Sequence, residues 1–139
     1  MTIKLALDRE YGRLELDALL GRIEIADGFG IIEARCTYID SWLDALIRGL
    51  QAIRAKSCVV IDLVDEPHAL VFEILDGSIM IAYKNMRVSA GSIESFTRSL
   101  EAAASSFLEM ILVDIGNETS ELTEGIRKFV EESKNPEID

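Results

Sequence analysis

The chain has 139 residues, of which 49% are hydrophobic and only two are proline, a composition typical of one compact domain with a real core. Its 25 acidic residues outnumber 14 basic ones, and because a phosphate backbone would repel the net charge of −11, nucleic acid is excluded as an expected partner. Apolar runs such as 110–113 are far shorter than the roughly 20 residues of a membrane span, and charged residues follow soon after the first methionine. We therefore expect a cytoplasmic protein without a membrane partner, in which Cys36 and Cys58 are buried free thiols.

The first part of the chain predicts three strands. Residues 3–7 alternate between apolar and polar side chains, which indicates a short strand at a sheet edge. A second alternating run contains Ile23, and the segment 18–21 before it is a bulge, a bend or a break between strands. The pair Asp27-Gly28 predicts a hairpin into the third strand, and a two-residue loop would place Ile23 opposite Ile32. A longer loop stays open because a phenylalanine and a glycine follow.

The hydrophobic period changes from two to about 3.6 near residue 40, which predicts a helix. Asp40 or Ser41 is the expected N-cap, because either side chain can accept a hydrogen bond from the free N–H groups of the first turn. Gly49 lies within the apolar stripe of this helix, where glycine destabilises a helix by about 1 kcal/mol relative to alanine. We therefore expect the helix to approach the sheet closely at Gly49.

The middle of the chain predicts a meander of three antiparallel strands between residues 58 and 84. The turn pair Asp76-Gly77 places Phe72 opposite Ile81, and a first loop at 65–68 would place Ile61 opposite Phe72. Both turns then put one apolar set of side chains on the same face of the meander.

Two further helices are expected after the meander. Residues 85–88 extend or end the last strand, Ser92 caps a long helix, and Gly116 ends it. Thr119 or Ser120 then caps the final helix.

The expected fold class is α+β, with about six antiparallel strands in two three-stranded meanders and the helices packed on one face of the sheet. The order is β-β-β-α-β-β-β-α-α. Residues 1–134 form this single domain, and 135–139 form a flexible tail.

No catalytic or cofactor motif is present in the sequence. The only histidine, His68, excludes a His-based triad and a His-rich metal site, and the chain has no glycine-rich phosphate loop or nucleophile elbow. Asp62 and Glu73 are the only acidic pair that the expected register puts on one face, and they lack a positive partner or a nucleophile. We therefore expect no enzyme activity, no catalytic residue, no cofactor and no metal.

The second face of the meander is the candidate binding surface. It is too apolar for a fully solvated face and too charged for a core, which is typical of an interaction surface, although a loop or the last helix covering it is an alternative. On or beside this face, we expect a basic protein partner to contact Asp62, Asp65, Glu66, Val71, Glu73 and Met80. The last helix around Glu121 and Glu124 is the second choice.

The order of features between residues 39 and 112 resembles several families of small bacterial immunity proteins. Trp42-Leu43 opens a helix, an acidic hairpin and Asp76-Gly77 follow, and Ser-Ile-Glu-Ser-Phe leads into a helix that ends near Phe107-Leu108. These families protect cells from polymorphic or contact-delivered toxins, and many are acidic α+β domains. The resemblance implies a non-catalytic protein that occludes a basic toxin domain. The other hypothesis is a self-associating, homodimeric module, because the second face is semi-apolar and an open sheet has exposed edges.

Overall fold

The computed structural model describes residues 1–9, 14–64 and 66–134. Within these ranges the chain is α+β, and the strands and helices follow the expected order with one additional strand. The elements are β1 (Thr2–Leu7), β2 (Leu20–Ala26), β3 (Ile31–Tyr38), α1 (Ile39–Ile53), β4 (Cys58–Ile61), β5 (Leu70–Leu75), β6 (Ser78–Tyr83), β7 (Met86–Gly91), α2 (Ile93–Ile115) and α3 (Glu121–Lys134). The expected tail at 135–139 lies outside the described residues.

The strands form two antiparallel sheets, so the expectation of one six-stranded sheet is wrong. One sheet has the order β1-β2-β3 and the other β4-β5-β6-β7. The additional strand β7 arises because the chain reverses between the paired residues Tyr83 and Met86, and Lys84 adopts a left-handed conformation with φ 57° in this turn. The two sheets meet where a Cβ on Gly30 would lie 2.3 Å from the Arg87 carbonyl oxygen.

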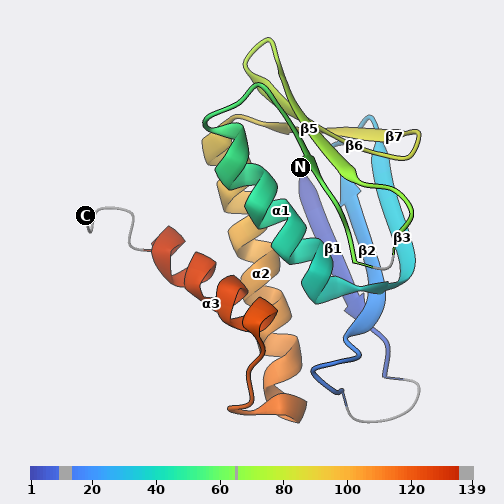
Figure 1. Cartoon of the computed structure of the whole chain (residues 1–139), viewed down its shortest axis with the longest axis vertical. Helices are drawn as coiled ribbons and strands as arrows, with labels where there is room; N and C mark the ends of the chain where they lie inside the picture. Colours follow the sequence, from blue (N-terminus) through green and yellow to red (C-terminus); the bar gives the residue numbers. More distant parts are fainter. Residues whose placement is uncertain (10–13, 65, 135–139) are drawn as a thin grey trace.

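The three helices lie on one side of the sheets, as expected (Figure 1). α1 and α2 pack against strands of both sheets, and α3 packs against α1 and α2 from the side away from the strands. The core therefore lies between the sheets and the α1–α2 pair, where its largest fully buried side chains include Trp42, Phe72, Tyr83, Phe96 and Phe107.

The register of the β5–β6 hairpin is confirmed, since Phe72 pairs with Ile81 across the Asp76-Gly77 turn. Two other expected registers are wrong by two residues: Ile61 pairs with Leu70, and Ile32 pairs with Ile25 across a four-residue loop. Side chains alternate with a period of two, so a shift of two residues leaves every apolar side chain on its original face. Hydrophobic pattern alone therefore does not distinguish these registers.

Both cysteines are exposed, so their expected burial is wrong. Cys36 lies where the pairing of β2 and β3 shifts register, in a left-handed conformation with φ 52°. Such a bulge re-aims a side chain that simple alternation would place on the other face. Cys58 lies on the open face of the edge strand β4.

The caps of α1 and α2 form in different ways. Ser92 caps α2 as expected, accepting a hydrogen bond from the Ser95 N–H at 3.1 Å, and the helix ends at Gly116 with φ 61°. The expected cap of α1 is wrong because the helix begins at Ile39 and its N-cap residue makes no side-chain cap bond. Ser41 instead accepts a hydrogen bond from the Val64 N–H at 3.2 Å, which ties the helix start to the loop after β4.

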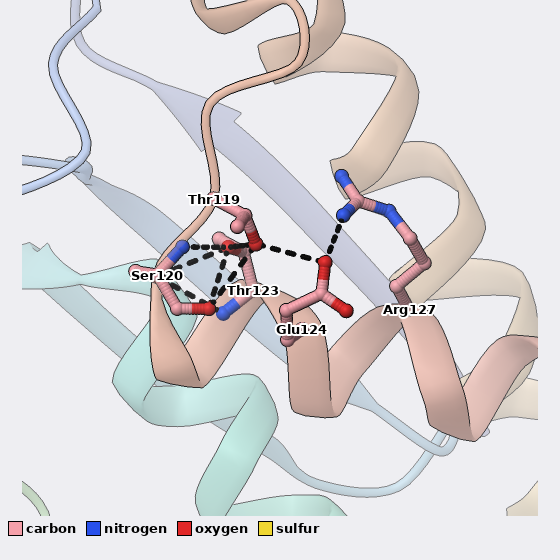
Figure 2. Close-up of polar contacts among 5 residues, drawn as sticks. All are labelled: Thr119, Ser120, Thr123, Glu124 and Arg127. Carbon is pink, nitrogen blue, oxygen red and sulfur yellow. Dashed lines mark hydrogen bonds and ion pairs between the residues drawn. The ribbon is translucent and has the colours of Figure 1, made fainter.

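Ser120 caps α3, as expected, through a reciprocal pair of hydrogen bonds (Figure 2). Its hydroxyl accepts from the Thr123 N–H at 3.1 Å, and the Thr123 hydroxyl accepts from the Ser120 N–H at 2.8 Å. Glu124 extends the cluster by accepting from the Thr119 hydroxyl at 3.0 Å and pairing with Arg127 at 2.6 Å. The start of α3 is thus fixed by its own side chains.

The expected close approach of helix and sheet at Gly49 is confirmed. A Cβ at this position would lie 2.3 to 2.6 Å from three atoms of the Phe72 ring. That ring is fully buried and stacks on Phe96 with their centroids 6.2 Å apart, so it has little room to move.

We expect Gly49→Ala to lower the free energy of unfolding by about 2 kcal/mol, because overpacking a core outweighs the better helix propensity of alanine. Urea unfolding measures the change. Gly125 in α3 is the matched control: a Cβ there meets nothing within 4 Å, so Gly125→Ala is expected to stabilise the protein by about 0.5–1 kcal/mol. Equal effects of both substitutions would contradict the close approach.

Candidate functional site

The outer face of the β4–β7 sheet holds the expected site residues that lie together in the structure. In the described ranges, the helices pack on the inner side of this sheet or on one another, so the alternative of a last helix covering this face is wrong. Val60 is 61% exposed, and its neighbours across the sheet are partly exposed. The residues in register on this face are Cys58, Val60, Val71, Glu73, Met80, Ala82, Arg87 and Ser89.

Three of the expected site residues lie together on this face. Glu73 pairs directly with Met80 and, on its other side, with Cys58, and Val71 is two residues from Glu73 on the same strand. Asp62 is exposed just beyond the end of β4 and does not pair with Val71 as expected, because the β4–β5 register is shifted. Asp65 lies outside the described residues.

Glu66, by contrast, is turned inward and joins a partly buried hydrogen-bond network. One of its carboxylate oxygens accepts from the Tyr83 hydroxyl at 3.2 Å and from the Thr37 hydroxyl at 3.3 Å. The Thr37 oxygen in turn accepts from the Trp42 indole N–H at 3.0 Å. This network connects β3, α1, β6 and the loop after β4, so Glu66 holds elements of both sheets together.

Tyr83 is the titratable group most affected by this network. Burial, followed by the negative charge of Glu66 and its hydrogen bond, raises the pKa of Tyr83 to about 12. Its ring also contacts Trp42 edge-on, with the centroids 4.9 Å apart, and the Lys84 ammonium lies 5.4 Å from the ring centre. The tyrosine is therefore held in its neutral, hydrogen-donating form.

The charge on the outer face is balanced, whereas the sequence predicted an acidic surface. Glu73 and Asp62 contribute negative charge, and Arg87, which pairs with Ala82 on the same face, contributes positive charge. Lys56 adds a second positive charge beside the start of β4. Sequence reasoning missed Arg87 because it did not recognise β7 as a separate strand.

A pocket of about 390 Å³ lies where the first turns of α1 and α3 come together. Asp40 lines it and is only 6% exposed; burial raises its pKa, partly opposed by a hydrogen bond from the Ser41 N–H. Asp17 and Glu121 also line the pocket, and its described lining contains no basic side chain. The arrangement provides a buried carboxyl with a raised pKa, without a positive group to stabilise a developing negative charge.

Other kinds of site have little support in the described part of the chain. No group of three His, Cys, Asp or Glu side chains there could hold a metal ion. None of the described helices is long and apolar enough to cross a membrane.

Comparison with known proteins gives no assignment. No protein-family model, curated protein or solved structure matches the chain. The resemblance to immunity proteins therefore stays a hypothesis based on the layout of the sequence. A functional hypothesis therefore rests on the geometry of the described surface, where the open outer face of the β4–β7 sheet is the strongest candidate for a binding site.

Proposed function

We propose that this protein is a non-catalytic binding module that recognises another protein through the outer face of its β4–β7 sheet. The observation that carries this proposal is the open, semi-apolar face formed by Val60, Val71 and Met80 around the half-buried Glu73. Apolar side chains around a few charged groups are the composition expected of a protein interface. The apolar contacts supply affinity, and Glu73 selects a partner that offers it a donor.

The sheet also provides a rigid support for this surface. Every second side chain on β5 and β6 is buried on the opposite face, where Phe72 and Ile81 pack in the core. A partner would therefore meet side chains fixed by the strand register, and little ordering would accompany binding.

Replacing Val71 by aspartate tests the proposed surface. We expect the variant to bind at least about tenfold less partner protein than the wild type does. The substitution puts a second negative charge two residues from Glu73, in the apolar centre of the face. The measurement is quantitative mass spectrometry of the proteins that co-purify with the tagged chain from its native host. Val113→Asp, at an 85% exposed position on α2, is the matched control and should retain the partner. Equal retention by both variants would contradict the proposal.

Neutralisation of a basic toxin in the bacterial cytoplasm is the second candidate function. It is favoured by the charge of the C-terminal helix, whose Glu121, Glu124 and Glu132 are exposed in a chain of net charge −11. Acidic side chains of this kind would speed the encounter with a basic partner. The test is co-expression with the C-terminal domain of a large secreted protein encoded next to this gene. Unchanged survival when this gene is deleted, together with no complex on mixing, would exclude this candidate.

A further inference from the structure

In the described part of the chain the two sheets have four edge strands, and these edges are not equally open to pairing with a further strand. The edges β3 and β7 face each other where the two sheets meet. β1 lies beside α2, where the Ser99 hydroxyl donates to the Met1 carbonyl oxygen at 2.9 Å. The remaining edge is β4, which packs against α1 on the inner side of its sheet and borders the proposed binding face on the other side.

The backbone groups that β4 directs to its free edge follow from one hydrogen bond. The Ile74 N–H donates to the Ser57 carbonyl oxygen at 3.0 Å, so Ser57 and Ile74 form a hydrogen-bonded pair. Such pairs alternate along an antiparallel ladder, and Val59 and Ile61 are therefore the next residues bonded to β5. The N–H and C=O groups of Cys58 and Val60 point the other way, and both residues are exposed.

We propose that a second copy of the chain pairs antiparallel with β4 and joins the two β4–β7 sheets into one. This inference rests on the proposed function, because the continuous sheet would extend the same outer face across both copies. Strand addition at an open edge is a common mode of protein recognition, and a two-fold interface uses the same patch on both copies.

The charges beside β4 select one register among those that the backbone allows. Hydrogen bonding requires Cys58 or Val60 of one copy to face Cys58 or Val60 of the other. Among these registers, the one with Cys58 opposite Val60 of the second copy brings Lys56, which precedes β4, closest to Asp62, which follows β4 in the other copy, and two-fold symmetry brings these charges together twice. Pairing Cys58 with itself would put Lys56 opposite a valine, and pairing Val60 with itself would put Asp62 opposite a cysteine.

The local charge explains why an acidic chain could associate at this edge. Between Asp44 and Asp62 the sequence contains three basic residues, Arg48, Arg54 and Lys56, and no acidic one. This local excess of basic residues reduces the repulsion between two chains of net charge −11 at β4, and Asp62 of each copy meets a basic segment of the other.

Sedimentation equilibrium over a wide range of concentration tests the dimer. We expect a reversible monomer–dimer equilibrium. Lys56→Glu should raise the Kd about tenfold or more, because it places a glutamate near Asp62 of the other copy at both ends of the paired strands. Asp62→Lys should weaken the dimer similarly, and the double variant should restore the wild-type Kd to within about threefold. A wild-type monomer at every concentration, or a double variant as weak as the singles, overturns the proposal.

Disulfide trapping tests the register independently of affinity. In a Cys36→Ser background, Val60→Cys places a new thiol opposite Cys58 of the second copy at the Cα separation of about 5.5 Å that a disulfide accepts. Mild oxidation should then give a covalent dimer, whereas Met80→Cys on the same face should not cross-link. A covalent dimer of the Cys36→Ser protein through Cys58 alone would overturn this register.

The dimer and the binding face fail in distinguishable ways. A monomer whose Val71→Asp variant still loses a retained partner overturns the dimer and leaves the proposed function in place. A dimer trapped through Val60→Cys, in a protein whose Val71→Asp variant retains every partner, supports the edge and overturns the outer face as the binding surface.

Discussion

Replacing Glu66 by alanine is expected to lower the free energy of unfolding by about 3 kcal/mol. The substitution removes the acceptor of two hydroxyl groups, on Thr37 and Tyr83, whose residues are 3% and 1% exposed. Buried donors without an acceptor are penalised by their full desolvation, which makes the loss larger than the net value of the two hydrogen bonds. Urea unfolding with a fluorescence readout measures the change, since Trp42 belongs to the network.

Two further variants separate the network from a general effect of the loop. Glu66→Gln keeps an acceptor oxygen and should lose less than half as much stability. Tyr83→Phe in the Glu66→Ala background removes one unsatisfied donor, so it should be less harmful there than in wild type. A change of less than about 0.5 kcal/mol in Glu66→Ala would be typical of a solvated surface residue and would contradict the inward placement of Glu66.

The pKa of Tyr83 gives the same network a pH dependence. Its folded pKa of about 12 lies above the ordinary value of 10.0, so the folded state holds the proton more tightly than the unfolded state. The stabilisation is fully present below pH 10.0 and is lost as the pH rises toward about 12. Glu66→Gln removes the negative charge and should move the ultraviolet titration of Tyr83 to lower pH.

The parts of the fold that could be predicted from the sequence are those fixed by local geometry. Asp76-Gly77 determined the β5–β6 register, because both residues adopt positive φ and form a two-residue turn. Gly49 signalled a close approach because a glycine inside a buried helical stripe needs a packing reason. Val71, Glu73 and Met80 were correctly grouped on one face for the same reason, since that face depends only on the register of this hairpin.

The parts that could not be predicted depend on contacts between distant segments. The loop containing Glu66 is rich in charge and proline, which is typical of a solvated turn, and nothing local indicates that this carboxylate meets Thr37 and Tyr83. The two sheets meet at Gly30 and Arg87, residues far apart in the sequence, and no periodicity predicts such a contact. The balanced charge of the outer face depends on Arg87 in turn, because only a separate strand β7 brings it there.

Replacing Asp27 by alanine is expected to lower the free energy of unfolding by about 3 kcal/mol, because this carboxylate joins the two sheets. It accepts hydrogen bonds from the Phe29 and Gly30 N–H groups at 2.8 and 2.7 Å within its own hairpin, and from the Ser89 N–H on β7 at 2.7 Å. Urea unfolding measures the loss. Asp44→Ala, which removes a surface ion pair with Arg48, is the matched control and should change stability by about 0.5 kcal/mol or less.

The acid limb of the stability curve tests whether the charge of Asp27 is responsible. The Ser89 N–H, followed by those of Gly30 and Phe29, holds the pKa of Asp27 below its ordinary value of 3.8. The folded state therefore binds this proton less readily than the unfolded state, so the stabilisation is present above pH 3.8 and is lost as the pH falls below it. Asp27→Ala should lose less stability than wild type over this range, and Asp27→Asn should do the same while keeping one acceptor oxygen. Curves that run parallel for all three proteins down to the acid transition would show that the sheets are joined without help from this carboxylate.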